Sequence, residues 1–478
     1  MKESTPFFRP VGTLARRELV TCDAQQTVTD VARLMHEHGI SGVVVCDAGR
    51  PEGIVTDRDL RGKVLAQGRD PARTRAAEIM STPLVTLAAE RPLHEALHRM
   101  SRQGIHRLVL TDADGALAGI VTATDLMRLQ AHSALGLVLD IEQAPSVEAL
   151  APLHAKVQAL VVDLVRQGLP TAELVRTVAR LNDQVLVRLI ELVRAQQFPR
   201  LSDRFAFLVL GSEGRCEQTL ATDQDNAIVY ADDLPADEVQ TQERFSHAVI
   251  DALIGIGVPE CKGGIMAKNE AWRRSLGDWR RTLDRWFATA TPEHVMAGSM
   301  FFDMRHVYGD QSLSQALQQD IAGAVSRNAP FLAHTAANVL HFAPPLGWFG
   351  RIKATRRDGR RTIDVKKAGL FAITEGVKVL AQQAGHTGGD TRERIAALVD
   401  AKVLGAGVGR ELTAAFDLLV QLRLRAQVEA IEAGGEPANH LDLGRMDTIA
   451  TAQLVQALRT VQSFGSFLEQ QFQIGALR

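Results

Sequence analysis

The sequence contains few cysteines, almost no net charge and no long apolar run. Its four cysteines form no CxxC or Cys/His spacing, so we expect neither a disulfide framework nor a zinc site. A net charge of −2 creates no overall field that would attract nucleic acid or an anionic membrane. No apolar run approaches membrane-spanning length, and the N-terminal segment "MKESTPFFRPVG" lacks an apolar signal core. These absences predict a cytoplasmic protein without a membrane or nucleic-acid partner.

The first 130 residues contain an internal repeat. In an alignment of the two copies, Gly39 matches Gly104 and Gly53 matches Gly119. Each copy has apolar residues at helical spacing, then "GVVV" or "RLVL", a glycine-containing turn, and "GIVT". The pattern predicts helix, strand, turn and strand in each copy. One copy alone would expose apolar surface, so we expect the two to pack face to face.

Residues 13–130 resemble a tandem CBS domain pair. The motif that carries the resemblance is Gly-Ile-Val-Thr-x-x-Asp, at 53–59 and again at 119–125. The resemblance implies that the Thr and Asp of each motif line clefts for the ribose and phosphate of AMP, ADP or ATP. These residues are Thr56, Asp59, Thr122 and Asp125. A Thr followed three residues later by an Asp also caps a helix, so a purely structural role stays open.

A helical connector is expected between 131 and 200. Strand signals are missing there, and apolar residues take a helical period. The apolar run "FAFLVL", at 205–210, then predicts a buried strand. A tight turn follows at Gly211 and Ser212, where small residues would let the backbone approach a phosphate.

Two aspartates follow this turn in "GSEGRCEQTLATDQDNAIVY". Because strand side chains alternate, Asp223 and Asp225 are predicted to share one face at the start of a second strand, "DNAIVY". Mg²⁺ commonly binds through one or two carboxylates together with substrate phosphates. An Asx turn at a strand entrance would also explain the pair. An EF-hand loop is excluded because Ala227 and Ile228 occupy positions of a ligand and the turn glycine.

The Gly-Ser turn, the spacer and Asp-x-Asp together resemble the DNA polymerase beta nucleotidyltransferase superfamily. The form "GSEGR…TDQDNAIV" is similar to the branch with nitrogen-regulatory uridylyltransferases, and closer to bacterial nucleotidyltransferase-like proteins joined to CBS pairs. This resemblance implies that Gly211, Ser212 and Arg215 contact a triphosphate. It also implies that Asp223 and Asp225 bind Mg²⁺ in catalysis. ATP or UTP would be the donor.

A third catalytic carboxylate is expected on a later strand. Asp303 is our candidate, at the end of the aromatic, strand-like run in "SMFFDMRHVYGD". Asp310 and Asp278 are alternatives, and an ion pair between Asp303 and Arg305 is the structural explanation. Between the acidic sites, Lys268 and Asn269 are candidates for contacts to the nucleotide.

The C-terminal part, 329–478, is predicted to be helical to its end. Its segment 351–367 has eight Lys or Arg against two Asp. Such a run is usually a solvated face. Across a cleft it could also bind the triphosphate or an acidic acceptor.

These patterns predict a multidomain α/β plus α protein with four parts. The parts are a CBS pair (13–130), a helical connector (131–200), a nucleotidyltransferase-like domain (201–328) and a helical substrate-binding domain (329–478). We expect Mg²⁺-dependent transfer of a nucleoside monophosphate to a protein or small-molecule acceptor, controlled by adenine nucleotides at the CBS pair, in a homodimer. The alternative is a non-catalytic adenine-nucleotide sensor.

Overall fold

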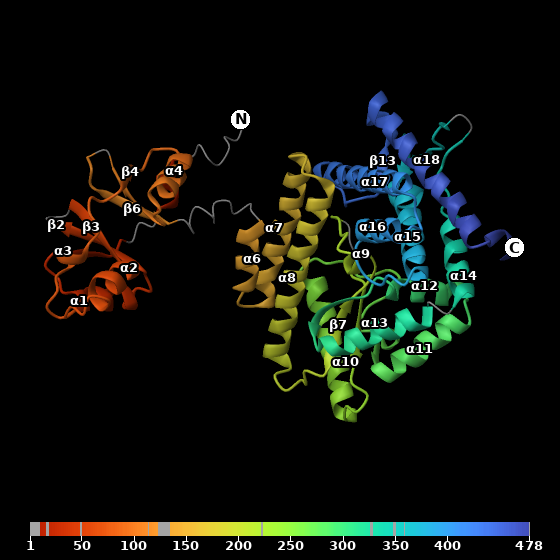
Figure 1. Ribbon diagram of the computed structural model, residues 1–478, viewed down its shortest axis with the longest axis horizontal. Coiled ribbons are helices and arrows are strands. Elements are labelled where there is room, and N and C mark those ends of the chain that lie inside the picture. The colour runs from red at the N-terminus through yellow and green to blue at the C-terminus, as the bar shows by residue number, and fades with distance from the viewer. Residues whose placement is uncertain are drawn as a thin grey trace. The chain divides into compact units, whose positions relative to one another are not determined.

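The computed structural model describes residues 10–15, 19–47, 50–112, 114–122, 134–220, 223–325, 328–347, 350–357 and 359–477. The chain divides into two units, Met1–Gly136 and Leu137–Arg478, which are treated separately below (Figure 1). No helix among the described residues is long and apolar enough to cross a membrane.

Unit 1 contains the predicted repeat as two sheets of identical topology. The strand orders are β1-β2-β3 and β4-β5-β6; the first pair of each sheet is parallel and the second antiparallel. The register shifts at the matching place in both, between Val45 and Cys46 and between Leu110 and Thr111. The strands are β1 (Thr21–Asp23), β2 (Gly42–Asp47), β3 (Arg50–Thr56), β4 (Thr86–Ala88), β5 (Arg107–Thr111) and β6 (Leu117–Thr122). The first strand of each copy was not predicted, because three residues show no clear alternation.

Each sheet of unit 1 is covered by one main amphipathic helix. Helix α1 (Val28–Glu37) starts at Thr27, whose hydroxyl accepts the Asp30 N–H, and α4 (Leu93–Gln103) ends at Gly104 in the left-handed region. Their apolar stripes fill two separate cores, as the helical spacing predicts. The short helices are η2 (Val11–Leu14), α2 (Asp57–Asp59), η3 (Leu60–Leu65) and α3 (Ala76–Ile79).

Unit 2 begins with the predicted connector helices and continues into a four-stranded sheet. The sheet order is β10-β7-β8-β9, in which β8 and β9 are parallel and the other pairs antiparallel. All five residues of β7 are buried, which confirms the predicted inner strand. The elements are α6 (Ala134–Glu142), α7 (Val147–Arg166), α8 (Thr171–Gln197), β7 (Phe205–Val209), α9 (Gly211–Gly214), β8 (Asn226–Tyr230), α10 (Ala236–Gly255), η4 (Glu270–Trp272), β9 (Arg273–Ser275), α11 (Leu276–Ala288), α12 (Pro292–Phe301), β10 (Arg305–Gly309) and α13 (Gln311–Val325).

The C-terminal part of unit 2 is mainly helical, but it also contains a small sheet that the sequence did not predict. Strands β11, β12 and β13 pair antiparallel, so the expectation of helix throughout was wrong for this segment. Strands β11 and β12 consist mostly of charged residues, so they show no alternation of apolar and polar side chains. The elements are α14 (Ala329–Leu340), β11 (Thr355–Arg357), β12 (Arg360–Asp364), η6 (Lys366–Leu370), α15 (Phe371–Gln383), α16 (Thr391–Asp400), α17 (Ala406–Glu432), β13 (His440–Asp442), η7 (Leu443–Arg445), α18 (Thr448–Gln471) and η8 (Ile474–Leu477).

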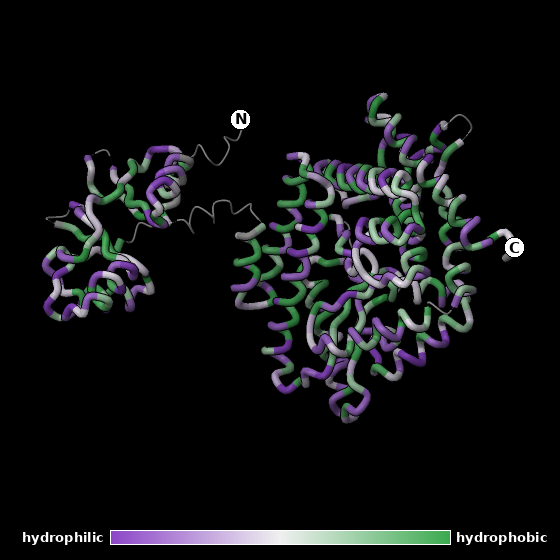
Figure 2. The backbone as a smooth tube through the Cα atoms, in the orientation of Figure 1, coloured by the Kyte–Doolittle hydropathy of each residue, from purple (hydrophilic) through white to green (hydrophobic). Residues whose placement is uncertain are grey.

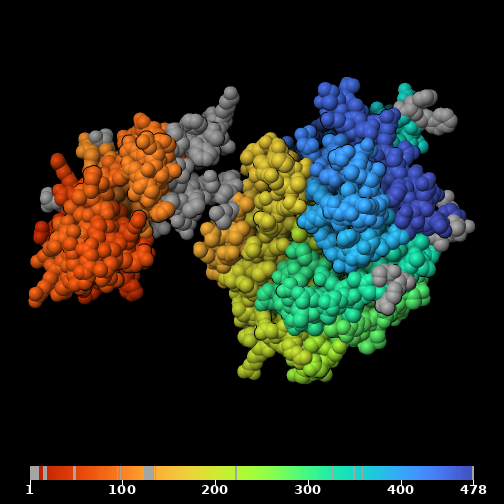
Figure 3. All heavy atoms as spheres, viewed as in Figure 1, coloured from red at the N-terminus to blue at the C-terminus, as the bar shows by residue number. Residues whose placement is uncertain are grey.

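The three C-terminal parts of the prediction form one continuous unit. Helix α17 contacts both α7 and α8, and Figure 3 shows the blue C-terminal helices against the yellow connector. The hydropathy pattern in Figure 2 alternates along these helices, since each buries only one side. The multidomain α/β plus α class is confirmed.

Candidate functional site

The turn after β7 brings the backbone next to an aspartate. The Leu210 N–H donates to the Asp225 carbonyl at 2.8 Å. Gly211 has φ of +55°, and a Cβ there would lie 3.0 Å from the Asp225 Oδ2 atom and 2.9 Å from the Met300 Cε atom. A left-handed backbone in so little space requires glycine at this position. The turn at Gly211 therefore packs directly against Asp225.

Asp223 and Asp225 lie just before β8 and not within it. The strand starts at Asn226, so the predicted alternation does not apply to these two residues. The structure still brings them together, with Asp223 on a larger cleft and Asp225 on a smaller one. Burial raises the pKa of Asp225, and the charge of Asp223 adds to this, while a hydrogen bond with Cys261 opposes it. Neither carboxylate forms a salt bridge in the part of the chain that the structure describes.

The two clefts meet at shared walls. The smaller has a volume of about 140 Å³ and is lined by Gly211, Ser212, Arg215 and Asp225 among others. The larger has about 860 Å³ and takes its walls from α7, α8, the segment that includes Asp223, and the C-terminal part. Thr219 and Lys366 line both clefts.

Two cations, Lys366 and Arg423, line the smaller cleft together with Asp225, and Lys366 also lines the larger cleft with Asp223. Arg423, on α17, is 8% exposed and donates to the Asn439 Oδ1 atom at 2.7 Å. Burial lowers its pKa to about 10. The Lys366 side chain is exposed to the cleft, but the protein around it lowers its pKa. The charge of Arg423 lowers this pKa further, whereas the charges of Asp223 and Asp225 raise it. Neither cation has a salt-bridge partner among the described residues. The charges of Asp364 and Asp223 oppose the lowering of the Arg423 pKa, so they offset part of the cost of burying this cation.

The sequence did not single out Lys366 or Arg423 individually. Lys366 belongs to the basic run 351–367, which the structure brings to the cleft through β12. Arg423 lies within an apolar helical stripe and carries no recognisable signal.

Asp303 is at the centre of a buried ionic cluster. Its Oδ2 accepts from Arg215 and from Lys378 Nζ at 2.8 Å, and its Oδ1 accepts from Arg394 Nη1 at 2.6 Å. Burial opposes ionisation of Asp303, but the three cations overcome it and hold its pKa below the usual range. Glu217 pairs with Arg215, and Glu375 pairs with Lys378 at 2.8 Å. Asp303 is therefore fully engaged within the protein.

The local prediction around Asp303 was wrong in two respects. The aromatic run is not a strand, because Met300 and Phe301 end α12 and β10 begins only at Arg305. Arg305 does not pair with Asp303 either; it holds Asp183 of α8, with Nη1 2.8 Å from Oδ2. Aromatic residues occur both in strands and at helix ends, so the sequence pattern did not distinguish a strand from the end of a helix at 300–302.

The other candidate residues lie outside both clefts. Asp310 accepts from the Ser312 N–H at 2.9 Å, and Asp278 accepts from the Ser275 hydroxyl at 3.2 Å. Lys268 pairs with Glu260, and Asn269 donates to the Gly264 carbonyl at 2.6 Å, which fixes the turn. None of these four candidates is among the described residues that line the clefts.

Family models match most of the chain. Residues 11–66 and 76–132 match the CBS domain. Residues 155–293 match "Putative nucleotidyltransferase DUF294", and 329–472 match "Putative nucleotidyltransferase substrate binding domain". The CBS domain-containing protein YhcV of Bacillus subtilis is 36% identical over 109 residues, 23% of this chain and 76% of YhcV. The chain belongs to the CBS-domain proteins, and it carries a DUF294 domain pair.

Other similarities also cover about a quarter of the chain. The uncharacterized protein MK0525 of Methanopyrus kandleri is 39% identical over 134 residues, 28% of this chain and 66% of MK0525. Among solved structures, the CBS domain pair of protein MJ0100, in complex with 5′-methylthioadenosine and S-adenosyl-L-methionine, is 25% identical. That likeness covers 26% of this chain and 97% of the other, with a TM-score of 0.24.

In the first CBS motif, Thr56 and Asp59 form a capping box. Thr56 donates its N–H to Asp59 Oδ2 at 3.0 Å and its hydroxyl to the same atom at 2.6 Å. Asp59 Oδ1 accepts from the Ser81 hydroxyl at 2.9 Å and lies 2.8 Å from Lys63 Nζ. The structural role is thus present, whereas ligand binding stays a prediction. Thr122 ends β6, and Asp125 lies outside the described residues.

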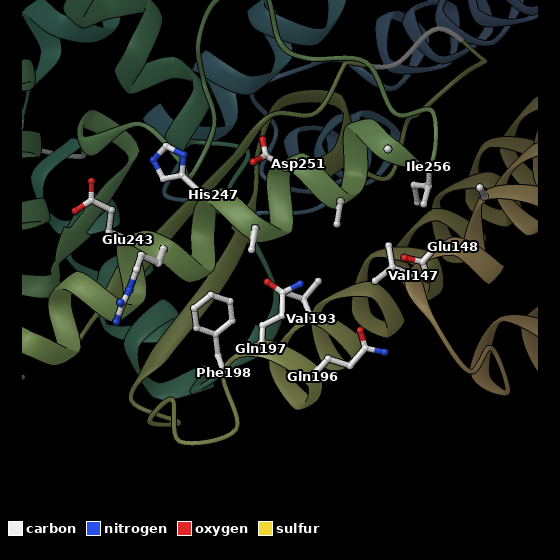
Figure 4. A pocket seen from close by; sticks show the side chains of 15 residues that line it. Val147, Glu148, Val193, Gln196, Gln197, Phe198, Glu243, His247, Asp251 and Ile256 are labelled. Atoms are coloured by element: carbon white, nitrogen blue, oxygen red, sulfur yellow. The ribbon is translucent and has the colours of Figure 1, made fainter.

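A cavity of about 870 Å³ lies elsewhere in unit 2, between α7, α8 and α10 (Figure 4). It is marginally larger than the cleft at Asp223. Its walls carry Glu148, Glu243, Asp251 and His247, and none of the predicted site residues. Its volume alone does not make it the functional site.

Replacing Gly211 tests the turn. Gly211→Ala adds a Cβ in a left-handed backbone, against Met300 and Asp225, and we expect unit 2 to lose about 1 to 2 kcal/mol of stability. Thermal and urea unfolding measure this. Gly255→Ala is the control, since its Cβ would meet no atom within 4 Å. Equal stability of the two variants would contradict the account of the turn.

Replacing Asp303 tests the ionic cluster. Asp303→Asn leaves Arg215, Lys378 and Arg394 buried with one anion fewer, so we expect a loss of about 3 to 5 kcal/mol in unfolding free energy. Asp320→Asn is the control, because its partially exposed pair with Arg280 should contribute less than about 1 kcal/mol. A similarly small effect of Asp303→Asn would show that the cluster is not needed for stability.

Proposed function

We propose that the DUF294 domain pair transfers a nucleoside monophosphate from an NTP to an acceptor hydroxyl and releases pyrophosphate. One observation carries this proposal: Asp223 and Asp225 share two adjoining clefts with Lys366 and Arg423, and none of the four forms a salt bridge among the described residues. A triphosphate with a divalent cation would complement both sets of charges. The family description of residues 155–293 supports the same class of reaction.

The residues at the turn suit Mg²⁺. Among the described residues no three His, Cys, Asp or Glu side chains form a metal-binding group, so an all-protein cage is not offered there. Mg²⁺ usually takes only one or two carboxylates and completes its shell with water and substrate phosphates. Asp223 and Asp225 would hold it. Bound there, Mg²⁺ would supply positive charge to the phosphates as their charge redistributes.

The chain's own groups would orient the substrate. Gly211 and Ser212 line the smaller cleft, where the phosphates would lie, and Lys366 and Arg423 would neutralise phosphate charge from its other walls. The acceptor oxygen bonds to the α-phosphorus while the bond to the bridging oxygen breaks. Pyrophosphate leaves with the bonding electron pair, and the hydroxyl proton passes to water. That Asp303 is itself catalytic stays a prediction from the sequence. We propose that it positions Arg215, because both carboxylate oxygens of Asp303 already accept hydrogen bonds within the protein.

Loss of the aspartates tests this reaction. With each NTP, Mg²⁺ and cell lysate as acceptor source, the wild type should release pyrophosphate. The Asp223→Ala/Asp225→Ala variant, or removal of Mg²⁺ by EDTA, should reduce release on the order of 100-fold or more. Asp233→Ala is the control, since this exposed residue pairs only with Arg204 at the surface. NTP binding without release in any condition would favour the alternative, a non-catalytic nucleotide sensor.

For the CBS pair we propose binding of AMP, ADP or ATP and control of the transferase in a homodimer. Family membership supports this, since the motif places Thr56 and Asp59 at the start of α2. Control requires unequal nucleotide affinity for two states of the enzyme.

AMP should raise the unfolding temperature of unit 1. At 100 times Kd the stabilisation would be about 2.7 kcal/mol. Differential scanning calorimetry of the full chain measures it, with CMP as the control nucleotide. Absence of a shift with AMP, ADP and ATP alike would contradict nucleotide binding by the CBS pair.

A further inference from the structure

The basic run 351–367 forms an exposed hairpin in the C-terminal part of unit 2. Strands β11 and β12 pair antiparallel, and β13 pairs with β12 only from Thr362 to Asp364, so the outer half of the hairpin is two-stranded. The run contains two acids, Asp358 and Asp364, and Asp358 lies outside the described residues. All the basic residues of the run are exposed, namely Arg351, Lys353, Arg356, Arg357, Arg360, Arg361, Lys366 and Lys367.

The register of the hairpin places like charges directly opposite each other. Arg356 is opposite Arg361, and Arg357 is opposite Arg360. Because side chains alternate along a strand, one arginine pair lies on each face of the hairpin. Like charges in opposed positions destabilise a strand pair, so stability of the hairpin does not account for this arrangement. An anionic partner would replace the repulsion between the arginines by attraction to a shared counter-charge.

The protein itself compensates little of this charge. Among the described residues, the one salt bridge of the run joins Arg360 Nε to Asp442 Oδ2 at 3.9 Å, and the Arg360 side chain is 62% exposed. A surface pair with this geometry contributes little to stability. A basic run is usually a solvated surface, but solvation does not require arginines in opposed positions. The arrangement therefore favours a binding surface for anions.

The side chains of the hairpin favour carboxylates as the anions. The planar guanidinium group of arginine binds one carboxylate through two parallel hydrogen bonds. Strands β11 and β12 contain no aromatic residue on which nucleic-acid bases would stack. The whole chain has a net charge of −2, so a long polyanion would also meet many acidic residues, whereas a short acidic segment contacts the hairpin alone. The partner that fits best is an acidic polypeptide segment.

The hairpin leads directly to the two clefts. Lys366, just after the end of β12, lines both clefts, and Asn439, just before β13, lines the larger one. A fully extended chain from Arg360 to Lys366 would span no more than about 22 Å. A polypeptide on the hairpin is thus held within that distance of the clefts. Residues 329–472, which contain the hairpin, match the putative substrate binding domain.

We propose that the β11–β12 hairpin binds an acidic segment of the acceptor, and that the acceptor is therefore a protein. The proposal rests on the proposed transferase function and names its acceptor class. Carboxylates of the acceptor contact the arginines while its hydroxyl group enters the clefts. There the hydroxyl oxygen bonds to the α-phosphorus, pyrophosphate leaves with the bonding electron pair, and the hydroxyl proton passes to water. A small-molecule acceptor would gain nothing from a cationic surface outside the clefts.

Binding of a model polyanion tests the surface. Fluorescein-labelled poly-L-glutamate is titrated with the full chain, and fluorescence anisotropy gives the Kd. The hairpin variant, Arg356→Gln/Arg357→Gln/Arg360→Gln/Arg361→Gln, should bind on the order of tenfold more weakly, and added salt should weaken binding of the wild type. Because the opposed arginines repel each other, this variant should unfold at a temperature no lower than that of the wild type.

A matched control removes the same amount of charge elsewhere. Arg180→Gln/Arg200→Gln/Arg285→Gln/Arg410→Gln replaces exposed arginines that belong to neither the hairpin nor the described lining of the clefts. This control should bind poly-L-glutamate within about twofold of the wild type. A loss of binding equal to that of the hairpin variant would show that only the overall charge matters and would overturn the surface.

Transfer of label tests the acceptor class. Each NTP, with a radioactive α-phosphate, is incubated with Mg²⁺, cell lysate and the wild type, the hairpin variant or the control. We expect labelled products that proteinase K degrades and nucleases do not. The hairpin variant should require on the order of tenfold more lysate for equal labelling. Its KM for the NTP should stay unchanged, since none of the four arginines is among the described residues that line the clefts.

Each other outcome counts against the proposal. Equal binding of poly-L-glutamate by the wild type and the hairpin variant overturns the surface. Tighter hairpin-dependent binding of a duplex oligonucleotide than of poly-L-glutamate, or nuclease-sensitive label, replaces the protein by nucleic acid as the partner. Pyrophosphate release with label only in small molecules overturns the protein acceptor and leaves the transferase intact. Absence of release with every NTP overturns both the acceptor and the transferase.

Discussion

The buried ion cluster around Asp303 is the constraint on which the site of unit 2 depends. Asp303 lies between α12 and β10, and its partners come from the turn after α9, from α15 and from α16. One carboxylate therefore ties the sheet to the C-terminal helices. Two further hydrogen bonds hold the same parts together: the Leu220 N–H donates to Gln427 Oε1 at 3.2 Å and the Thr391 N–H donates to Glu217 Oε1 at 2.7 Å. The energy of burying these charges is compensated because each has a partner.

Unit 2 also contains charged side chains that form no salt bridge. Asp223, Asp225, Lys366 and Arg423 lie in clefts, and none has a salt-bridge partner among the residues that the structure describes. Paired charges fix the framework, and unpaired charges mark where a ligand would complete the electrostatics.

Local patterns predicted the elements that are repetitive or continuous in sequence. The CBS repeat and the buried strand β7 were predicted because motif and periodicity are local properties. The environment of Asp303 was not, since its three cations come from distant segments. Asp223 and Asp225 were selected from their spacing, and the predicted strand alternation does not apply to them because β8 begins at Asn226. Lys366 was noted only as part of the basic run 351–367. Arg423 was not noted, because the burial of a single cation in an apolar helix depends on tertiary packing.

The central claim is that Asp223 and Asp225 hold a divalent cation against a triphosphate. Its most direct test is Mn²⁺ binding by electron paramagnetic resonance, with a non-hydrolysable NTP analogue, in the full chain and in Asp223→Ala/Asp225→Ala. The account predicts a nucleotide-dependent Mn²⁺ site in the wild type that is lost in the variant, while the fold is retained. Identical Mn²⁺ binding by both proteins would contradict it.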